Sequence, residues 1–216
     1  LAGSAAPALV RYLSSDVAVT SGATSVYPDA PSPLQEFSVV YTDRAMNHMS
    51  APFGVMMREL HEGLCAVYNA EHAVLIPGSG TYGMEAVARQ FGGPGRKCVA
   101  IRNGYFSYRW SHVFDACSIP SEHIVLKARD VGGGQYAPVP IEELEETIAK
   151  EKPAVMFAPQ VETSTGILIP DEYIKRAAAA MHAQGGLFVL DCIASGTLWA
   201  DMEALGIDAL ISAPQK

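Results

Sequence analysis

The chain has 216 residues, of which 49% are apolar and 18% are charged, and its formal net charge at pH 7 is -8. This composition supports a sizeable buried core and excludes an intrinsically disordered protein. The negative charge, with no basic stripe along the sequence, argues against nucleic acid or an acidic membrane surface as a partner.

The cysteines and the apolar runs indicate the cellular compartment of the protein. Cys65, Cys98, Cys117 and Cys192 form no CxxC pair and have no histidine cluster at metal-ligand spacing, so we expect reduced thiols and no metal site. The first residues lack the basic start and sustained apolar run of a signal peptide, and no stretch reaches the ~20 apolar residues that span a bilayer. We therefore expect a cytoplasmic protein.

The first half of the chain predicts two helices and two strands. Apolar residues recur at helical spacing from 51 to 70. A short apolar run then leads into GSGTYGMEAVARQF at 78–91, which is a Gly-rich turn that opens a helix. The strand KCVAIR at 97–102 precedes the polar stretch NGYFSYRW, and the next predicted strand is HIVLKA at 123–128.

The second half continues the alternation of strands and helices. A helix is predicted over 141–152, with acidic residues early and lysines late to match the helix dipole. The loop GGGQYAPVP precedes it. The strand AVMFAP at 154–159 and the loop QVETSTG then lead to a helix at 171–184, which stops at two glycines. LFVL at 187–190 and IDALIS at 207–212 are the last strands. This order predicts an α/β fold with a mostly parallel sheet covered by helices on both faces.

Five polar clusters directly follow predicted strands. In an open α/β sheet, ligands bind beyond the carboxyl ends of the strands. We therefore expect these clusters to meet on one rim of the sheet, which we interpret as the active-site edge. The clusters are GSGT, NGYFS, QVETSTG, DCIAS and APQK.

The segment GSGTYG at 78–83 predicts a phosphate site. It offers backbone N–H groups and two hydroxyl groups at a helix N-terminus, where the free amides and the helix dipole attract an anion. The Gly-Lys-Ser/Thr ending of a Walker A loop is missing. The competing interpretation is an ordinary Gly-rich turn with a Ser or Thr N-cap.

Asp191 and Lys216 point to the cofactor. A buried carboxylate needs a cationic partner, and a protonated pyridine nitrogen would be one. The alternative is that Asp191 only caps the turn after its strand. Lys216 follows the next strand, and a lysine among apolar neighbours becomes a better nucleophile toward aldehydes. Together with a phosphate site and an aromatic side chain, these residues predict pyridoxal 5'-phosphate.

With these residues in place, the sequence resembles the class V aminotransferases of the fold type I pyridoxal-phosphate enzymes. The resemblance is strongest to the alanine–glyoxylate and serine–pyruvate aminotransferase branch. It runs from about Ala51 to Lys216 and is carried by GSGTYGMEA, NGYFSYR, VETSTG, LDCIASG and ISAPQK. It implies an N-terminal segment over 1–50 and the cofactor-binding large domain over 51–216. It also implies a homodimer and a smaller C-terminal domain after Lys216 that supplies an arginine for the substrate carboxylate.

The resemblance implies roles for nine residues. Asp191 and Lys216 are the implied catalytic pair, and ordinary packing is the competing interpretation for Phe106 and Ile193. The sequence departs from the family pattern at Gln160, where the family often has histidine. The implied cofactor contacts are phosphate binding by Ser79, Gly80, Thr81 and Gln215, ring packing by Phe106 and Ile193, a hydrogen bond near the ring's O3' from Thr163, pairing of Asp191 with the ring nitrogen, and a Schiff base at Lys216.

The leading interpretation of function is a transaminase. It would move an amino group from a small amino acid such as alanine or serine to a 2-oxo acid such as glyoxylate or pyruvate, with Lys216 carrying the proton. Lyases of the cysteine desulfurase type share the fold. They commonly have histidine at the places of Gln215 and Phe106, so the residues present favour transamination. A third interpretation is a non-catalytic domain that binds a phosphate ligand, which the joint presence of Asp191 and Lys216 disfavours.

Overall fold

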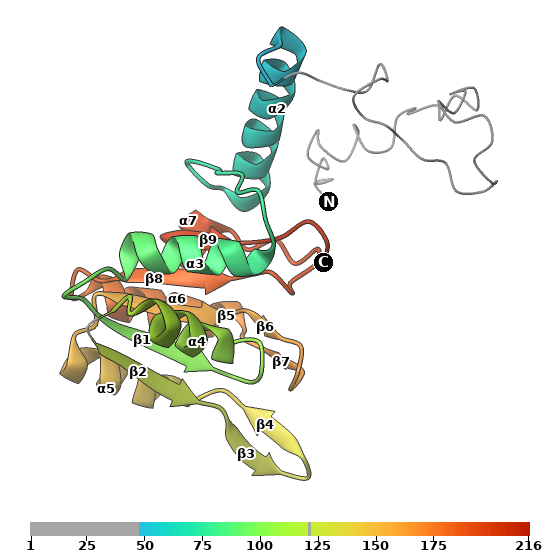
Figure 1. Ribbon diagram of the computed structural model, residues 1–216. Helices are drawn as coiled ribbons and strands as arrows, with labels where there is room; N and C mark the ends of the chain where they lie inside the picture. The colour runs from blue at the N-terminus through green and yellow to red at the C-terminus, as the bar shows by residue number, and fades with distance from the viewer. Residues whose placement is uncertain (1–47, 121) are drawn as a thin grey trace, which may run out of the picture. The chain divides into compact units, whose positions relative to one another are not determined.

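A computed structural model of the protein describes residues 48–120 and 122–216 (Figure 1). The chain divides into two compact units. One comprises the residues up to Val67 together with Glu71–Ala73, and the other comprises Tyr68–Ala70 with Val74–Lys216. The N-terminal segment predicted over 1–50 lies almost entirely outside the described residues.

The described part of the first unit consists mainly of one helix, α2 (Ala51–Tyr68). The Ser50 side chain accepts a hydrogen bond from the backbone N–H of Phe53 (3.3 Å), as an N-cap residue does. The imidazole of His61 contacts the carbonyl oxygen of Ala73 (3.0 Å), which joins the helix to the following segment of the same unit. The helix predicted over 51–70 therefore forms, with a slightly earlier end.

The second unit is built on a five-stranded sheet in which every neighbouring pair is parallel. This confirms the predicted parallel α/β fold. The register places Asp191, the last residue of its strand, opposite Pro159 on one side and Ile211 on the other. The spatial order is β2 (Glu122–Lys127), β1 (Lys97–Arg102), β5 (Val155–Pro159), β8 (Leu187–Asp191) and β9 (Ala209–Ile211).

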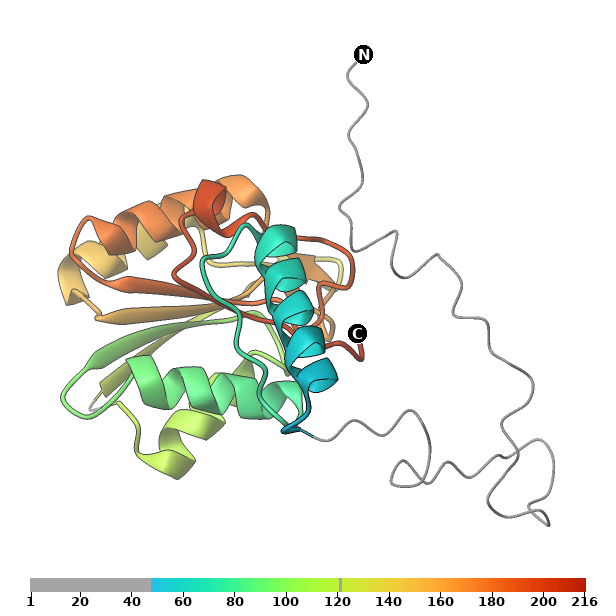
Figure 2. The same cartoon turned by 90° about the horizontal axis from the view of Figure 1, so that it is seen from above.

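Helices cover both faces of this sheet, as Figures 1 and 2 show. α3 (Gly80–Phe91) and α4 (Tyr108–Cys117) pack on one face. α5 (Ile141–Glu151), α6 (Asp171–His182) and α7 (Met202–Leu205) pack on the other. α4 is an addition to the prediction, because the sequence analysis treated its start only as a polar stretch after a strand.

The strands are apolar on both faces because each face buries its own core. In β5, Phe157 joins the cluster under α3 and α4, whereas Met156 and Ala158 join the cluster under α5 and α6. Phe157 packs against Trp110 with ring centroids 4.5 Å apart, and both side chains are fully buried. Burial of each such side chain stabilises the fold by about 1.5–3 kcal/mol. The sheet is therefore a rigid support for the side chains at the ends of its strands.

Two segments predicted as loops are β-hairpins. β3 (Arg129–Gly132) pairs with β4 (Gln135–Ala137), and β6 (Val161–Glu162) pairs with β7 (Ile167–Leu168). In the first hairpin Gly132, Gly133 and Gly134 all have φ between 63° and 94°, which permits a tight reversal between the strands. The prediction of a loop over 132–140 was wrong for β4, because the run of glycines hid the short strand that follows the turn.

Candidate active site

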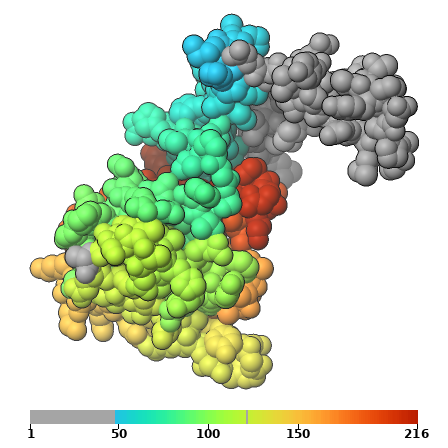
Figure 3. Space-filling view, viewed as in Figure 1, coloured from blue at the N-terminus to red at the C-terminus, as the bar shows by residue number. Residues whose placement is uncertain are grey.

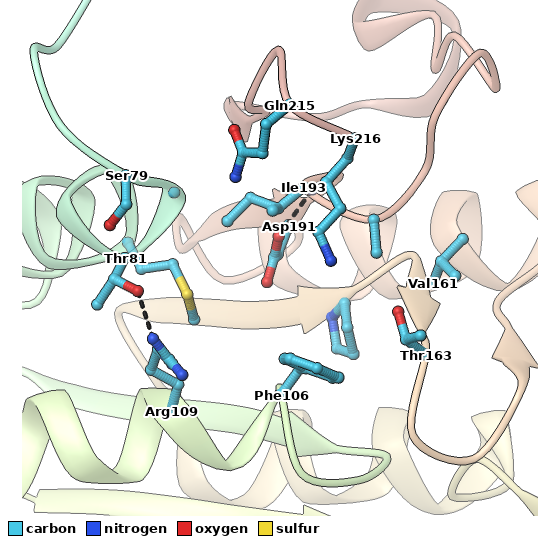
Figure 4. Close-up of a pocket in the computed structure, with 14 residues that line it drawn as sticks. Ser79, Thr81, Phe106, Arg109, Val161, Thr163, Asp191, Ile193, Gln215 and Lys216 are labelled. Atoms are coloured by element: carbon cyan, nitrogen blue, oxygen red, sulfur yellow. Dashed lines mark hydrogen bonds between the residues drawn. The ribbon is translucent and has the colours of Figure 1, made fainter.

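The carboxyl ends of the strands surround a pocket with a volume of about 150 Å³ (Figure 4). Its walls come from the start of α3, the β1–α4 loop, the ends of β5 and β8, the β6–β7 hairpin and the C-terminal turn. The structure brings together all nine residues to which the sequence analysis assigned a role. They are Ser79, Gly80, Thr81, Phe106, Thr163, Asp191, Ile193, Gln215 and Lys216.

The start of α3 presents backbone amides to the pocket. Ser79 is the N-cap residue, and its carbonyl oxygen accepts hydrogen bonds from the amides of Tyr82 (2.8 Å) and Gly83 (3.4 Å). The first amides of a helix, here those of Gly80 and Thr81, have no acceptor within the helix. The Ser79 side chain makes no capping hydrogen bond, so its hydroxyl is available as well. These donors suit an anion better than they suit an ordinary capped turn.

α3 approaches Ile193 closely at Gly80. A Cβ atom at position 80 would lie 2.7 Å from Ile193 Cδ1, so the Ile193 side chain would have to shift. Ile193 lines the same pocket, so the glycine lets the start of α3 and this apolar wall of the pocket meet. A side chain added at position 80 would therefore displace either the start of α3 or the Ile193 side chain.

We expect Gly80→Ala to weaken cofactor binding and to lower the free energy of unfolding by about 1–3 kcal/mol, which is the usual cost of overpacking. The measurement is titration with pyridoxal phosphate together with thermal unfolding. Gly93→Ala is the matched control, because the nearest atom to its added Cβ is 3.8 Å away. Equal affinities of the two variants for the cofactor would contradict the assignment of this contact to the site.

Asp191 is a buried carboxylate that lines the pocket from the end of β8. It is 8% exposed, and its Oδ1 accepts a hydrogen bond from the backbone N–H of Ile193 (3.0 Å). No basic side chain among residues 48–120 and 122–216 forms an ion pair with it. Burial raises the pKa of Asp191 to about 6, helped by the charge of Glu162 and opposed by the Ile193 hydrogen bond and by Arg109. A cation that enters the pocket would therefore stabilise the ionised carboxylate.

Lys216 reaches the pocket from the C-terminal turn. Its Nζ lies 5.4 Å from the centroid of the Phe106 ring, within the range of a cation–π contact. The residue is exposed, and the last residues of the chain form part of the molecular surface in Figure 3. Lys216 follows a short strand and a turn at the rim, and the apolar side chains of Phe106 and Ile193 line the same pocket.

Phe106 and Thr163 come from two loops that are held against each other. The β1–α4 loop carries Phe106, and the β6–β7 hairpin carries Thr163. The Thr165 hydroxyl donates to the carbonyl oxygen of Asn103 (3.0 Å), and the Tyr105 N–H donates to Ser164 Oγ (2.8 Å). The pocket wall opposite the start of α3 therefore consists of two loops that are joined by hydrogen bonds.

Arg109 lines the pocket and was missed in the sequence analysis. Its Nη1 donates a hydrogen bond to Thr81 Oγ1, which places a positive charge beside the start of α3 (Figure 4). Arg109 forms no ion pair with any other described residue. The signal was present in the sequence: Arg109 follows Phe106 by three positions at a helix start, so both can face the same side.

The chain belongs to the class V aminotransferase family, since the model of that family matches residues 18–216. Among characterised relatives, L-aspartate–glyoxylate aminotransferase of Paracoccus denitrificans is 30% identical over 176 residues, which cover 79% of this chain and 43% of that protein. Alanine–glyoxylate aminotransferase of Mus musculus is 26% identical over 176 residues, covering 80% and 40% of the two chains.

A solved structure agrees with the observed fold. The ureidoglycine–glyoxylate aminotransferase of Bacillus subtilis superposes with a TM-score of 0.67 at 22% identity, over 82% of this chain and 44% of that chain. The chain therefore spans less than half the length of each of these three proteins. Their common fold is that of the fold type I pyridoxal-phosphate transferases, as the resemblance implied.

Proposed function

We propose that this chain carries the pyridoxal-phosphate site of an aminotransferase that moves an amino group from a small amino acid to a 2-oxo acid such as glyoxylate or pyruvate. One observation carries the proposal: a helix start rich in free amides, an unpaired buried Asp191 and Lys216 line a single pocket. The names of the relatives, which are aspartate–glyoxylate and alanine–glyoxylate aminotransferases, support the donor and acceptor classes.

The residues of the pocket fit this cofactor. The amides of Gly80 and Thr81, the Ser79 hydroxyl, the Gln215 amide and the Arg109 guanidinium are donors for a phosphate group. Asp191 is an acceptor that lacks a cation, which a protonated ring nitrogen supplies. Phe106 and Ile193 are apolar groups for the two faces of the ring.

When bound, pyridoxal phosphate supplies an aldehyde that condenses with amines and a ring that withdraws electrons from the substrate Cα. The Lys216 ε-amino group would be the nucleophile toward that aldehyde and afterwards the base that moves the proton from Cα. Asp191 would hold a proton on the ring nitrogen. Thr163 would donate a hydrogen bond near O3', and Phe106 would exclude water from one ring face.

A lyase of the cysteine desulfurase type is the alternative on the same fold. Gln215 and Phe106 stand where that branch commonly has histidine, and both line the pocket. Transamination is therefore the better supported chemistry. Release of alanine and transferable sulfur from cysteine, with no amino transfer to glyoxylate, would reverse this preference.

We also propose that the protein is a homodimer in a reducing compartment such as the cytoplasm. The homodimer is what membership of the class V aminotransferase family implies. All four cysteines are free thiols. No helix of the described part of the chain is long and apolar enough to cross a membrane.

The function is tested by reconstitution of the full-length polypeptide that carries this sequence with pyridoxal phosphate. We expect a visible absorbance band that borohydride abolishes and, by peptide mass mapping, a reduced pyridoxyl adduct on Lys216. A screen of amino donors against glyoxylate and pyruvate then defines the reaction. An adduct spread over surface lysines with none on Lys216 would contradict the assignment of the nucleophile.

A further inference from the structure

Glu162 is a charged side chain to which the proposed chemistry gives no task. It ends β6 and is fully buried, with 0% of its surface exposed. Removal of a carboxylate from water is costly unless hydrogen bonds or a counter-ion replace the lost solvation. Among the described residues Glu162 forms no ion pair. Hydrogen bonds must therefore account for its presence in the interior.

Five hydrogen bonds converge on this carboxylate. Oε2 accepts from the N–H of Ser107 (2.8 Å) and from its hydroxyl (2.6 Å). Oε1 accepts from the N–H of Phe106 (3.1 Å), the N–H of Ser164 (3.3 Å) and the Ser164 hydroxyl (2.6 Å). Burial acts to raise the pKa of Glu162, but these hydrogen bonds outweigh it, so the pKa lies below its usual value and the group is ionised.

The donors all belong to the two loops that form one wall of the pocket. Ser107 is the N-cap residue of α4, so the carboxylate also lies at the positive end of that helix dipole. Glu162 is the only carboxylate in the β1–α4 loop and the β6–β7 hairpin. Both segments contribute a side chain to the pocket, Phe106 from the loop and Thr163 from the hairpin.

Gly104 shows how closely the loops approach each other. A Cβ atom at position 104 would lie 2.2 Å from Ser164 Oγ and 2.8 Å from Glu162 Cδ. The absence of a side chain there lets the carboxylate reach both loops at once. The contact is specific rather than a general consequence of burial, because it needs a glycine, a carboxylate and two serine hydroxyls in register.

We propose that Glu162 is a positioning residue: its ionised carboxylate fastens the β1–α4 loop to the β6–β7 hairpin and so fixes Phe106 and Thr163 relative to Asp191. The effect of this fastening on the cofactor rests on the proposed function, whereas the fastening itself does not. Glu162 acts through other residues and does not itself line the pocket.

The test is Glu162→Gln in the full-length polypeptide, read by hydrogen–deuterium exchange without cofactor and by pyridoxal-phosphate titration. A glutamine turns an NH₂ group toward donors and breaks at least two of the bonds. We expect exchange in the segment 103–109 to accelerate about 10- to 100-fold, as loss of charged hydrogen bonds implies, and the cofactor dissociation constant to rise by a similar factor. Exchange in β8 stays unchanged.

Asp208→Asn is the matched control. The Asp208 carboxylate accepts hydrogen bonds from the N–H of Phe188 (2.7 Å) and contacts His182 (2.9 Å), at the opposite end of β8 from the pocket. It lowers stability without touching the two loops. Glu162→Asp keeps the charge, and we expect it to restore part of the cofactor affinity and the circular dichroism of the bound cofactor.

The outcomes separate the inference from the function. Wild-type exchange rates at 103–109 in Glu162→Gln, or faster exchange spread evenly over the sheet as in the control, would overturn the positioning role. Failure of the wild type to bind pyridoxal phosphate would instead overturn the proposed function and leave the exchange result valid. If Glu162→Gln does not fold, Ser164→Ala removes only the Ser164 hydroxyl contacts, and unchanged exchange at 103–109 in that variant would overturn the proposal.

Discussion

Replacement of Lys216 with alanine is expected to lower the rate of amino transfer by about 10⁴-fold or more, at the upper limit of what one general base contributes. Among residues 48–120 and 122–216, Lys216 is the only lysine that lines the pocket. In the proposed function its loss removes both the nucleophile toward the cofactor aldehyde and the base that moves the proton. The measurement is single-turnover conversion of a bound amino donor, followed by absorbance.

Two controls sharpen this result. Lys216→Arg keeps the positive charge near the Phe106 ring but lacks a neutral amine at working pH, so we expect it to be as inactive as the alanine variant. Small primary amines added to Lys216→Ala should restore part of the rate, because they can carry the proton in place of the side chain. A rate within tenfold of wild type in Lys216→Ala would remove the lysine from the mechanism.

Asp191→Asn is expected to reduce both cofactor affinity and the rate of amino transfer, the latter by roughly 10³-fold. The asparagine has the same shape but cannot hold a proton on the ring nitrogen. Two opposite charges about 4 Å apart interact by about 4 kcal/mol at an effective dielectric constant of about 20, which corresponds to about three powers of ten. Cofactor titration and single-turnover kinetics measure the two effects.

The pH dependence follows from the raised pKa of Asp191. In the cofactor-free protein the pKa of Asp191 is about 6, against 3.8 for an ordinary aspartic acid side chain. The carboxylate is therefore protonated below pH 6, and cofactor affinity should fall as the pH drops through that value. Asp191→Asn should lack this part of the pH profile. A wild-type profile that stays flat from pH 5 to pH 7 would contradict the pairing of Asp191 with the ring.

The same raised pKa has the opposite consequence for stability without cofactor. The folded state binds the proton more tightly than the unfolded state, so the contribution of Asp191 is complete below pH 3.8 and is lost as the pH rises through about 6. The difference corresponds to about 3 kcal/mol. At neutral pH the cofactor-free Asp191→Asn variant should therefore unfold at a higher temperature than the wild type. A lower unfolding temperature would show that the carboxylate is better solvated than its burial indicates.

The sequence was sufficient to predict the sheet because its strands contain continuous apolar runs that only a two-sided core can bury. The convergence of Phe106 and Asp191 could be predicted because each follows a parallel strand and such strands end at one rim, whereas Thr81 lies at the start of α3 after an apolar run that forms no strand. α4 was missed although Trp110, Val113, Phe114 and Cys117 have helical spacing, because the polar residues before them dominated the interpretation.

Glu162 could not be assigned from sequence for a different reason. It stands in a Ser- and Thr-rich turn and reads as a solvated loop residue. Its partners Phe106 and Ser107 are 56 and 55 positions away, and no local pattern reports a contact over that separation. The hydrogen bond of Arg109 to Thr81, 28 positions earlier, is likewise not visible in the sequence, although the spacing of Arg109 from Phe106 indicated the side that it faces. From their polarity alone such residues are predicted to be exposed, and only the folded structure shows their distant hydrogen-bond partners.

The place of Asp191 at the end of an interior strand has a consequence for how the sequence can vary around the pocket. Its carbonyl oxygen accepts from the N–H of Gln160 (2.9 Å), and the next residue, Cys192, donates to Ile211 (2.7 Å), so the backbone is bonded to both neighbouring strands. Phe106, Thr163 and Gln215 stand on turns that can lengthen or shorten. Insertions and deletions can therefore reshape the turns around the pocket, while the sheet keeps Asp191 in its position.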